Sequence, residues 1–149
     1  MRKYVLDTNL YIAADRDLEE AEELISFYSA FLPSTYLHAV VAQELLLGAV
    51  DARRGRLIRD SYITPFEARG RLINPTYHAW TRSGEVIAAL VQRKAISPGG
   101  FRRSFLNDVL LAASCREAGA TLITRNLSDF ERIRRVEPFD LMPPWPTPS

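Results

Sequence analysis

Hydrophobic residues in this chain follow two patterns, short unbroken runs and longer stretches with helical spacing. Short apolar runs bounded by turn residues are typical of buried strands, whereas apolar positions three and four residues apart are typical of amphipathic helices. The runs predict strands over residues 4–6, 35–38, 72–75, 121–124 and 139–142. The spacing predicts helices over residues 19–28 with Asp17 as the cap, 40–53, 58–68 with an interruption at Pro65, 76–94, 103–118 and 128–133.

Strands that alternate with helices predict an α/β domain of three layers, with helices on both faces of a central, mainly parallel sheet. Residues 4–6 are apolar at every position, as expected of a central strand buried on both faces. We expect a single domain over residues 1–142. Residues 143–149 read PPWPTPS and are expected to form a polyproline-like tail outside the core.

Composition narrows the class of protein. The chain of 149 residues is 47% hydrophobic and 25% charged, which is typical of a globular domain and excludes a disordered chain. Cys115 is the only cysteine, which excludes an intramolecular disulfide and a zinc site built on cysteines. No apolar run approaches the ~20 residues of a membrane span, and Asp7 interrupts the first run before it reaches signal-peptide length. We therefore expect a cytoplasmic protein without membrane contact.

Most basic residues of the chain are arginines. The net charge is only +1, yet just two of the 19 basic residues, Lys3 and Lys94, are lysines. Arginine suits phosphate because its planar guanidinium donates two parallel hydrogen bonds. Any single cluster is nonetheless more often a solvated helix face. The arginine clusters lie within residues 53–59, 69–71, 102–103 and 132–135.

Four acidic residues, Asp7, Glu44, Asp108 and Asp129, lie in apolar or tightly punctuated surroundings. Each follows a predicted strand or belongs to an apolar helical stretch, where a carboxylate is costly unless its charge is balanced. Since the carboxyl ends of parallel strands share one edge of a sheet, we expect the four to meet in one pocket. Carboxylates that converge repel one another unless cations lie between them. The pattern therefore predicts a divalent-metal site, and ligation by oxygen alone favours Mg²⁺ or Mn²⁺ over zinc.

Each acid also has a purely structural explanation. Asp7 is placed to cap a turn or helix, and Asp108 and Asp129 lie near predicted helix N-termini, where the helix dipole favours a negative charge. Glu44 is harder to explain in this way, because it shares the core-facing stripe of an apolar helix. The sequence contains neither a dinucleotide-binding glycine motif nor a P-loop, and we expect His38 and His78 to be structural.

Four segments together resemble the PIN-domain family, and within it the VapC-type toxins of bacterial toxin–antitoxin pairs. They read YVLDTN, VVAQELLLGA, NDVLLAAS and LITRNLSDFERI, and they occur in this order between residues 4 and 133. The resemblance implies a PIN-like α/β/α sandwich and a ribonuclease that depends on Mg²⁺ or Mn²⁺. It also implies an RNA substrate, and an antitoxin protein that keeps the enzyme inactive.

The resemblance places the first three acids of the family at Asp7, Glu44 and Asp108. The fourth falls either at Asn126 or three positions later at Asp129; we favour Asp129, with Asn126 assisting, and leave open whether a second metal ion binds. Three further residues match family positions that support the acids by hydrogen bonding, namely Thr8, Asn9 and Thr124.

Expectations about partners and two alternatives complete the prediction. We expect the antitoxin to insert an Arg or Lys among the carboxylates and to dock near residues 40–68, and we expect a homodimer. One alternative is a catalytically inactive PIN-like module that binds RNA or a partner. Another is a phosphotransfer domain in which Asp7 carries the phosphoryl group. Haloacid-dehalogenase-like enzymes, however, have a second Asp two residues after the first, where this chain has Asn9.

Overall fold

The computed structural model describes residues 2–148, and at its centre is a five-stranded sheet in which all neighbouring strands are parallel. The strand order is β3-β2-β1-β4-β5, which puts β1 in the middle and β3 at an edge. The predicted α/β class with a parallel sheet is confirmed. The strands are β1 (Lys3–Leu6), β2 (Thr35–His38), β3 (Leu72–Ile73), β4 (Ala120–Ile123) and β5 (Asp140–Met142).

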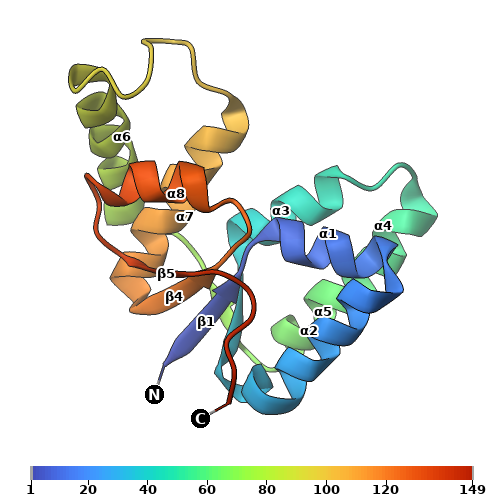
Figure 1. The fold of residues 1–149 in the computed structure, drawn as a ribbon. Coiled ribbons are helices and arrows are strands. Elements are labelled where there is room, and N and C mark those ends of the chain that lie inside the picture. The colour runs from blue at the N-terminus through green and yellow to red at the C-terminus, as the bar shows by residue number, and fades with distance from the viewer. Residues whose placement is uncertain (1, 149) are drawn as a thin grey trace.

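Helices cover both faces of this sheet, with α1 to α5 on one face and α6 to α8 on the other (Figure 1). Two short helices of other types lie in the connections. The 3₁₀ helix η1 (Leu32–Ser34) leads from α2 to β2, and the π-helix η2 (Arg59–Ile63) joins α4 to α5. The helices are α1 (Thr8–Arg16), α2 (Leu18–Phe31), α3 (Ala39–Leu47), α4 (Ala52–Ile58), α5 (Thr64–Ala68), α6 (Tyr77–Gln92), α7 (Arg103–Ala118) and α8 (Leu127–Arg134).

The first helix, α1, was not among the predicted helices. It begins immediately after Asp7, where the sequence predicts only a turn or cap. Asp17 then serves both helices: its N–H donates to the carbonyl of Ala13 (3.0 Å) at the end of α1, and its side chain accepts from the N–H of Glu19 (2.8 Å) at the start of α2. A boundary of a single residue contains no glycine or proline, so the sequence offers no loop signal that would separate two helices.

The predicted helix over residues 40–53 is wrong as a single element. α3 ends before Gly48, and Asp51 starts α4 by accepting a hydrogen bond from the N–H of Arg54 (2.8 Å). Pro65 does not interrupt a helix either. It lies in the first turn of α5, where its missing N–H would have no partner within the helix.

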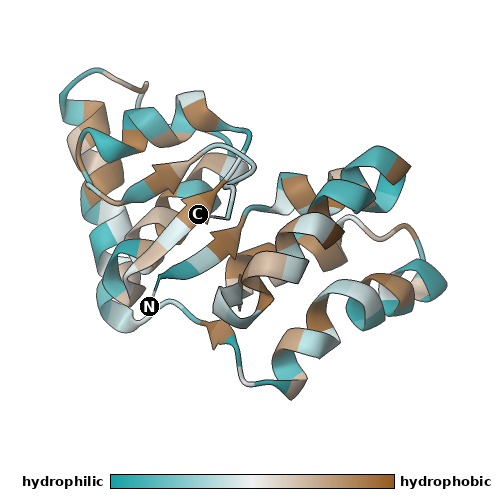
Figure 2. Ribbon diagram, turned by 60° about the horizontal axis from the view of Figure 1, so that its bottom comes forward, coloured by the Kyte–Doolittle hydropathy of each residue, from teal (hydrophilic) through white to brown (hydrophobic). Residues whose placement is uncertain are grey.

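The core lies around the two central strands, β1 and β4. Val5, Leu122 and Ile123 are completely buried, and Figure 2 shows hydrophobic residues along much of the sheet. Helices on both faces explain why these strands are apolar at consecutive positions rather than at alternate ones. Each such side chain stabilises the fold by roughly 1.5–3 kcal/mol through its burial, so the two strands are fixed firmly in register.

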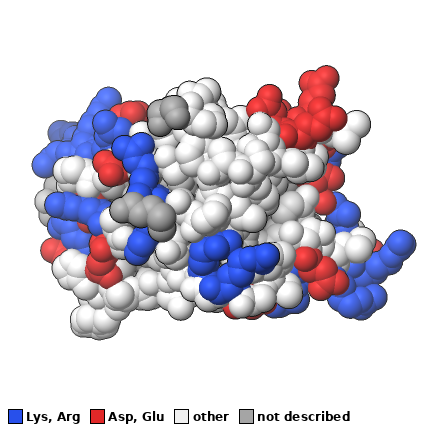
Figure 3. Space-filling view, turned by 90° about the horizontal axis from the view of Figure 1, so that it is seen from below, with Lys and Arg blue, Asp and Glu red and all other residues white. Residues whose placement is uncertain are grey.

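The surface at the amino ends of the strands has a broad uncharged centre. In Figure 3, basic side chains gather at the left, at the lower right and in one group below the centre of this face, and one group of acidic side chains lies at the upper right. Several arginines are paired with acids, among them Arg54 with Asp15 and Arg134 with Glu131. Pairing and solvation therefore account for much of the arginine content. Within residues 2–148, no helix combines the length and hydrophobicity that are needed to cross a bilayer.

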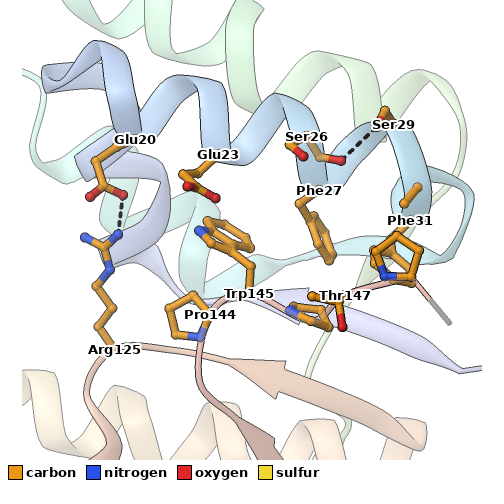
Figure 4. Close-up of a pocket in the computed structure, with 13 residues that line it drawn as sticks. Glu20, Glu23, Ser26, Phe27, Ser29, Phe31, Arg125, Pro144, Trp145 and Thr147 are labelled. Atoms are coloured by element: carbon orange, nitrogen blue, oxygen red, sulfur yellow. Dashed lines mark hydrogen bonds and ion pairs between the residues drawn. The ribbon is translucent and has the colours of Figure 1, made fainter.

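The C-terminal segment packs against the domain instead of remaining apart from it. Trp145 is partly buried against the core, and its ring lies 5.3 Å from the ring of Phe27 in α2. Figure 4 shows both rings on the wall of a cavity. The expectation that the tail lies outside the core is therefore wrong for Trp145, whose large apolar surface favours burial.

A buried ion cluster joins the helices of the second face. Glu137, which follows α8 and is 2% exposed, accepts hydrogen bonds from Arg82 of α6 (3.2 Å) and from Arg116 of α7. Two guanidinium groups balance the one buried carboxylate, which would otherwise be strongly unfavourable. The cluster thus fixes the chain after α8 to α6 and α7.

His38 is structural, as the sequence predicts. Its Nδ1 accepts from the N–H of Val40 (3.1 Å) and caps α3, and its Nε2 lies 2.8 Å from the hydroxyl of Ser114 in α7. The side chain is completely buried, and this burial lowers the pKa of His38 to about 4. The neutral ring therefore connects β2, α3 and α7.

We expect acid to weaken the fold through His38. The unfolded chain takes up a proton near the usual histidine pKa of 6.5, while folded His38 resists protonation down to about pH 4. Between these values the free energy of unfolding should fall by at most ~1.4 kcal/mol per pH unit. Urea unfolding of the wild type and of His38→Asn, which keeps the capping acceptor but does not titrate, measures this. Parallel pH profiles of the two proteins would contradict the assignment.

Candidate active site

Asp7 lies at the carboxyl end of β1. Its backbone N–H donates to the carbonyl of Ile123 (2.9 Å), which extends the pairing of β1 with β4 by one residue. Its carboxylate accepts from the N–H of Thr8 (2.8 Å) and so caps α1. The side chain is 5% exposed, and burial raises the pKa of Asp7 although its hydrogen bonds act to lower it. Asp7 is therefore a structural cap and a buried carboxylate at once.

Thr124 connects Asp7 to the loop before α8. Its hydroxyl donates to Oδ2 of Asp7 (2.7 Å) and accepts from the N–H of Asn126 (3.0 Å). The amide of Asn9 completes this network, since its Nδ2 lies 3.3 Å both from Oδ2 of Asp7 and from the Thr124 hydroxyl. A threonine hydroxyl has one donor and two acceptor positions, and all three are used here.

Glu44 reaches the same network from α3. The Thr8 hydroxyl donates to one of its oxygens (2.6 Å), and the side-chain amide of Asn107 donates to the other (3.4 Å). Asn107 was not among the predicted site residues, although it directly precedes Asp108 in the segment NDVLLAAS. Only the fold brings α3 and α7 close enough for this contact.

Asn126 joins the remaining two acids. Its Nδ2 lies 3.5 Å from Oδ2 of Asp108 and 3.2 Å from Oδ2 of Asp129. Asn126 directly precedes α8, and Asp129 belongs to the first turn of that helix. The amide thus holds a carboxylate of α7 near a carboxylate of α8.

Asp108 shows how closely the four acids interact. Burial is the largest cause that raises its pKa, and the charges of Asp7, Glu44 and Asp129 raise it further, to about 8. The charge of Arg102 opposes these effects only in part. The structure therefore brings the four acids into one electrostatic unit that carries an excess of negative charge.

The donors of this unit fit a hard divalent cation such as Mg²⁺ or Mn²⁺, since all are carboxylate, amide or hydroxyl oxygens. The Oδ1 atom of Asn9 is buried and has no hydrogen-bond partner within residues 2–148. In the same part of the chain, no three His, Cys, Asp or Glu side chains stand arranged to hold an ion as a group. Mg²⁺ does not require such a group, because it commonly binds through one or two carboxylates and keeps several water molecules.

A cavity of about 610 Å³ lies between α2 and the C-terminal segment, away from the four acids (Figure 4). Arg125 of the loop before α8 pairs with Glu20 at one end of it. The cavity is lined by two glutamates, Glu20 and Glu23, and by the Trp145 ring. It contains none of the four acids of the candidate site.

We expect Thr124→Val to destabilise the protein in metal-free buffer. The change keeps the shape of the side chain but leaves buried Asp7 without its shortest side-chain hydrogen bond, which costs roughly 1–3 kcal/mol. Urea unfolding at neutral pH measures the loss. Thr121→Val in β4, the strand that Thr124 directly follows, is the matched control, because within residues 2–148 the Thr121 hydroxyl forms no hydrogen bond with a site residue. An equal loss in both variants would show that the bond to Asp7 contributes nothing special.

Comparison with known proteins identifies the family and the fold. The chain matches the PIN domain over residues 4–136. It resembles a chain of DNA-bound VapBC from Salmonella typhimurium, with a TM-score of 0.70 and 18% identity over 96% of this chain and 98% of that one. FitAcB from Neisseria gonorrhoeae gives 0.69 and 19% over 97% and 99%. VapBC2 from Rickettsia felis, bound to a promoter DNA fragment, gives 0.66 and 22% over 96% and 98%.

At these identities the structural likenesses concern the fold. No curated protein matches the sequence. The family match is decisive, since it spans most of the chain and includes Asp7, Glu44, Asp108 and Asp129. The chain belongs to the PIN domain family.

Proposed function

We propose that this chain is a ribonuclease that depends on Mg²⁺ or Mn²⁺ and acts as the toxin of a toxin–antitoxin pair. The observation that carries the proposal is the convergence of the four acids in one hydrogen-bonded network, where burial and the charges of the other three together raise the pKa of Asp108. Acids held together against their mutual repulsion are expected where positive charge binds. Membership of the PIN domain family supports a nuclease.

The proposed ligands are Asp7, Glu44, Asp108 and Asp129, of which one or two would bind the ion directly and the others through its water molecules. A divalent ion held among them would lower the pKa of a bound water and offset the charge of the phosphate. Thr8, Asn9 and Thr124 support the carboxylates through the hydrogen bonds described above. Either Asp7 or Asp108 would accept the proton of the attacking water, and no side chain would form a covalent intermediate. Asn126, which donates to both Asp108 and Asp129, links the third acid to the fourth.

We expect Asp7→Asn and Asp108→Asn each to lower RNA cleavage by more than ~100-fold, because even the loss of an outer-shell partner of a metal ligand commonly costs 10–100-fold. Cleavage of a labelled single-stranded RNA in Mn²⁺ measures this, and EDTA should abolish wild-type activity. Asp60→Asn is the matched control, since Asp60 is exposed in η2.

Metal binding can be followed without activity. Mn²⁺ should raise the melting temperature of the wild type and of Asp60→Asn, and should raise that of Asp7→Asn much less. An undiminished shift in Asp7→Asn would exclude Asp7 as a ligand. A wild-type chain that binds Mn²⁺ but cleaves no RNA would favour the inactive binding module.

An antitoxin partner is the second part of the proposal. The similar structures described above include VapBC assemblies bound to DNA. In this chain the excess negative charge of the site suits an Arg or Lys from a partner, and a guanidinium can bind a carboxylate through two hydrogen bonds. The homodimer and the cytoplasmic location stay predictions.

The helices of the first face offer a docking groove for this partner. A pocket of about 150 Å³ lies between α1, α3 and α4 and is lined in part by Tyr11, Leu45 and Ile58. Val50, which also lines it, is 88% exposed, and Leu57 of α4 is 46% exposed. Apolar residues on the rim of a groove are typical anchors for an amphipathic helix.

We expect Val50→Asp combined with Leu57→Asp to prevent complex formation with the protein encoded by the neighbouring upstream reading frame. Both side chains are exposed, so a charge should disturb docking more than folding. Copurification after co-expression measures this. Leu18→Asp with Ile25→Asp, at exposed positions of α2, is the matched control. Copurification of the groove variant would place the partner elsewhere.

A further inference from the structure

A third pocket adjoins the candidate active site through Asp129. It has a volume of about 280 Å³ and lies between α8 and the segment that joins α6 to α7 (Figure 1). Asp129 belongs both to its wall and to the candidate active site, where the Asn126 amide connects it to Asp108. The residues that give the pocket its chemical character are Ser97, Phe101, Arg102, Ser104, Asp129 and Arg132.

Two arginines dominate the charge of this pocket. Within residues 2–148, neither Arg102 nor Arg132 forms an ion pair, although Arg134 on the same helix as Arg132 pairs with Glu131. The wall thus contains two cationic side chains and one anionic side chain. Arg102 is also near enough to Asp108 to act on its pKa. A cationic pocket therefore lies directly beside the acidic site.

The loop that forms the wall has a defined shape. Gly100 donates from its N–H to the carbonyl of Ser97 (3.0 Å), and Gly99 between them has a φ of +69°. With Pro98 at the second position, this is the pattern of a type II turn. A Cβ on Gly100 would lie 3.0 Å from Cβ of Ser97, so a side chain there would crowd the turn. Phe101 packs against the core just after the turn.

The acidic site alone cannot hold a long RNA strand. Carboxylates attract metal ions but repel the phosphates on either side of the one being cleaved. A neighbouring phosphate therefore needs a cationic contact close to the carboxylates. Guanidinium groups suit this purpose, because they offer phosphate two parallel hydrogen bonds and remain charged at all relevant pH values.

We propose that the pocket between Arg102 and Arg132 binds a phosphate of single-stranded RNA adjacent to the phosphate that is cleaved. The proposal rests on the ribonuclease function proposed above and adds a substrate-binding subsite to it. Arg102, which directly precedes α7, and Arg132 of α8 contact the phosphate, and the turn at Ser97–Gly100 closes the pocket on the third side.

The test measures RNA binding separately from cleavage. Asp7→Asn serves as the parent, so that a labelled single-stranded RNA stays intact during titration over a range of salt concentrations. Adding Arg102→Ala and Arg132→Ala should weaken binding about tenfold or more. The slope of the logarithm of the RNA association constant against the logarithm of the salt concentration should also become shallower, by about 0.7 for each lost phosphate contact. Arg53→Ala with Arg56→Ala in α4 removes the same charge at exposed positions and should change binding less than about twofold.

Cleavage and metal binding add two further readouts. With Asp7 restored, the double variant should have a raised KM, and Mn²⁺ should still raise its melting temperature. If the two arginines only balance the acids, RNA binding will not change and Mn²⁺ will bind more tightly, which overturns the subsite. An equal loss of RNA binding in the control variant with Arg53→Ala and Arg56→Ala would also overturn the subsite. If the wild type cleaves RNA and the double variant binds and cleaves RNA equally well, the subsite alone is refuted. If the wild type neither binds nor cleaves RNA, the proposed function is refuted as well.

Discussion

The hydrogen bond from Thr124 to Asp7 depends on the parallel pairing of β1 with β4, and the arrangement of the other site residues depends on that bond. Leu6 pairs with Ile123 in the register of the two strands, so the next residues of both strands emerge side by side. The hydroxyl of Thr124 then fixes Asp7 on one side and the N–H of Asn126 on the other. Asn126 in turn holds Asp108 and Asp129. A shift of one residue between these strands would turn Thr124 to the other face and separate the network.

The parts that could be predicted from sequence are those with a local cause. Buried parallel strands require consecutive apolar residues, so β1 and β4 were visible as short runs, and Glu44 stood out because a carboxylate on an apolar stripe is costly. The boundary at Asp17 was missed because a single residue ends one helix and starts the next. Asn107 was missed for a different reason, since its role arises from a contact with Glu44, which lies far away along the chain.

Burial of a charged side chain is unfavourable, and two buried acids of this domain are accommodated in different ways. Glu137 is buried between two arginines, so its charge is balanced within the protein and its role is structural. Asp7 is buried with hydrogen bonds from neutral groups only, and its pKa is raised. The first solution is complete without any further molecule, whereas the second leaves negative charge unbalanced. This contrast distinguishes a buried acid that is paired within the protein from one that we propose as a metal ligand.

The order of the strands has one more consequence. From β1 the chain continues into helices on one face of the sheet, and from β4 it continues into a helix on the other face. The two connections leave in opposite directions, which makes the space between β1 and β4 a topological switch point, where α/β sheets place their crevices. The crevice is thus a product of chain topology and needs no special backbone conformation. Its chemistry can therefore change through side chains alone, while the architecture that creates it stays the same.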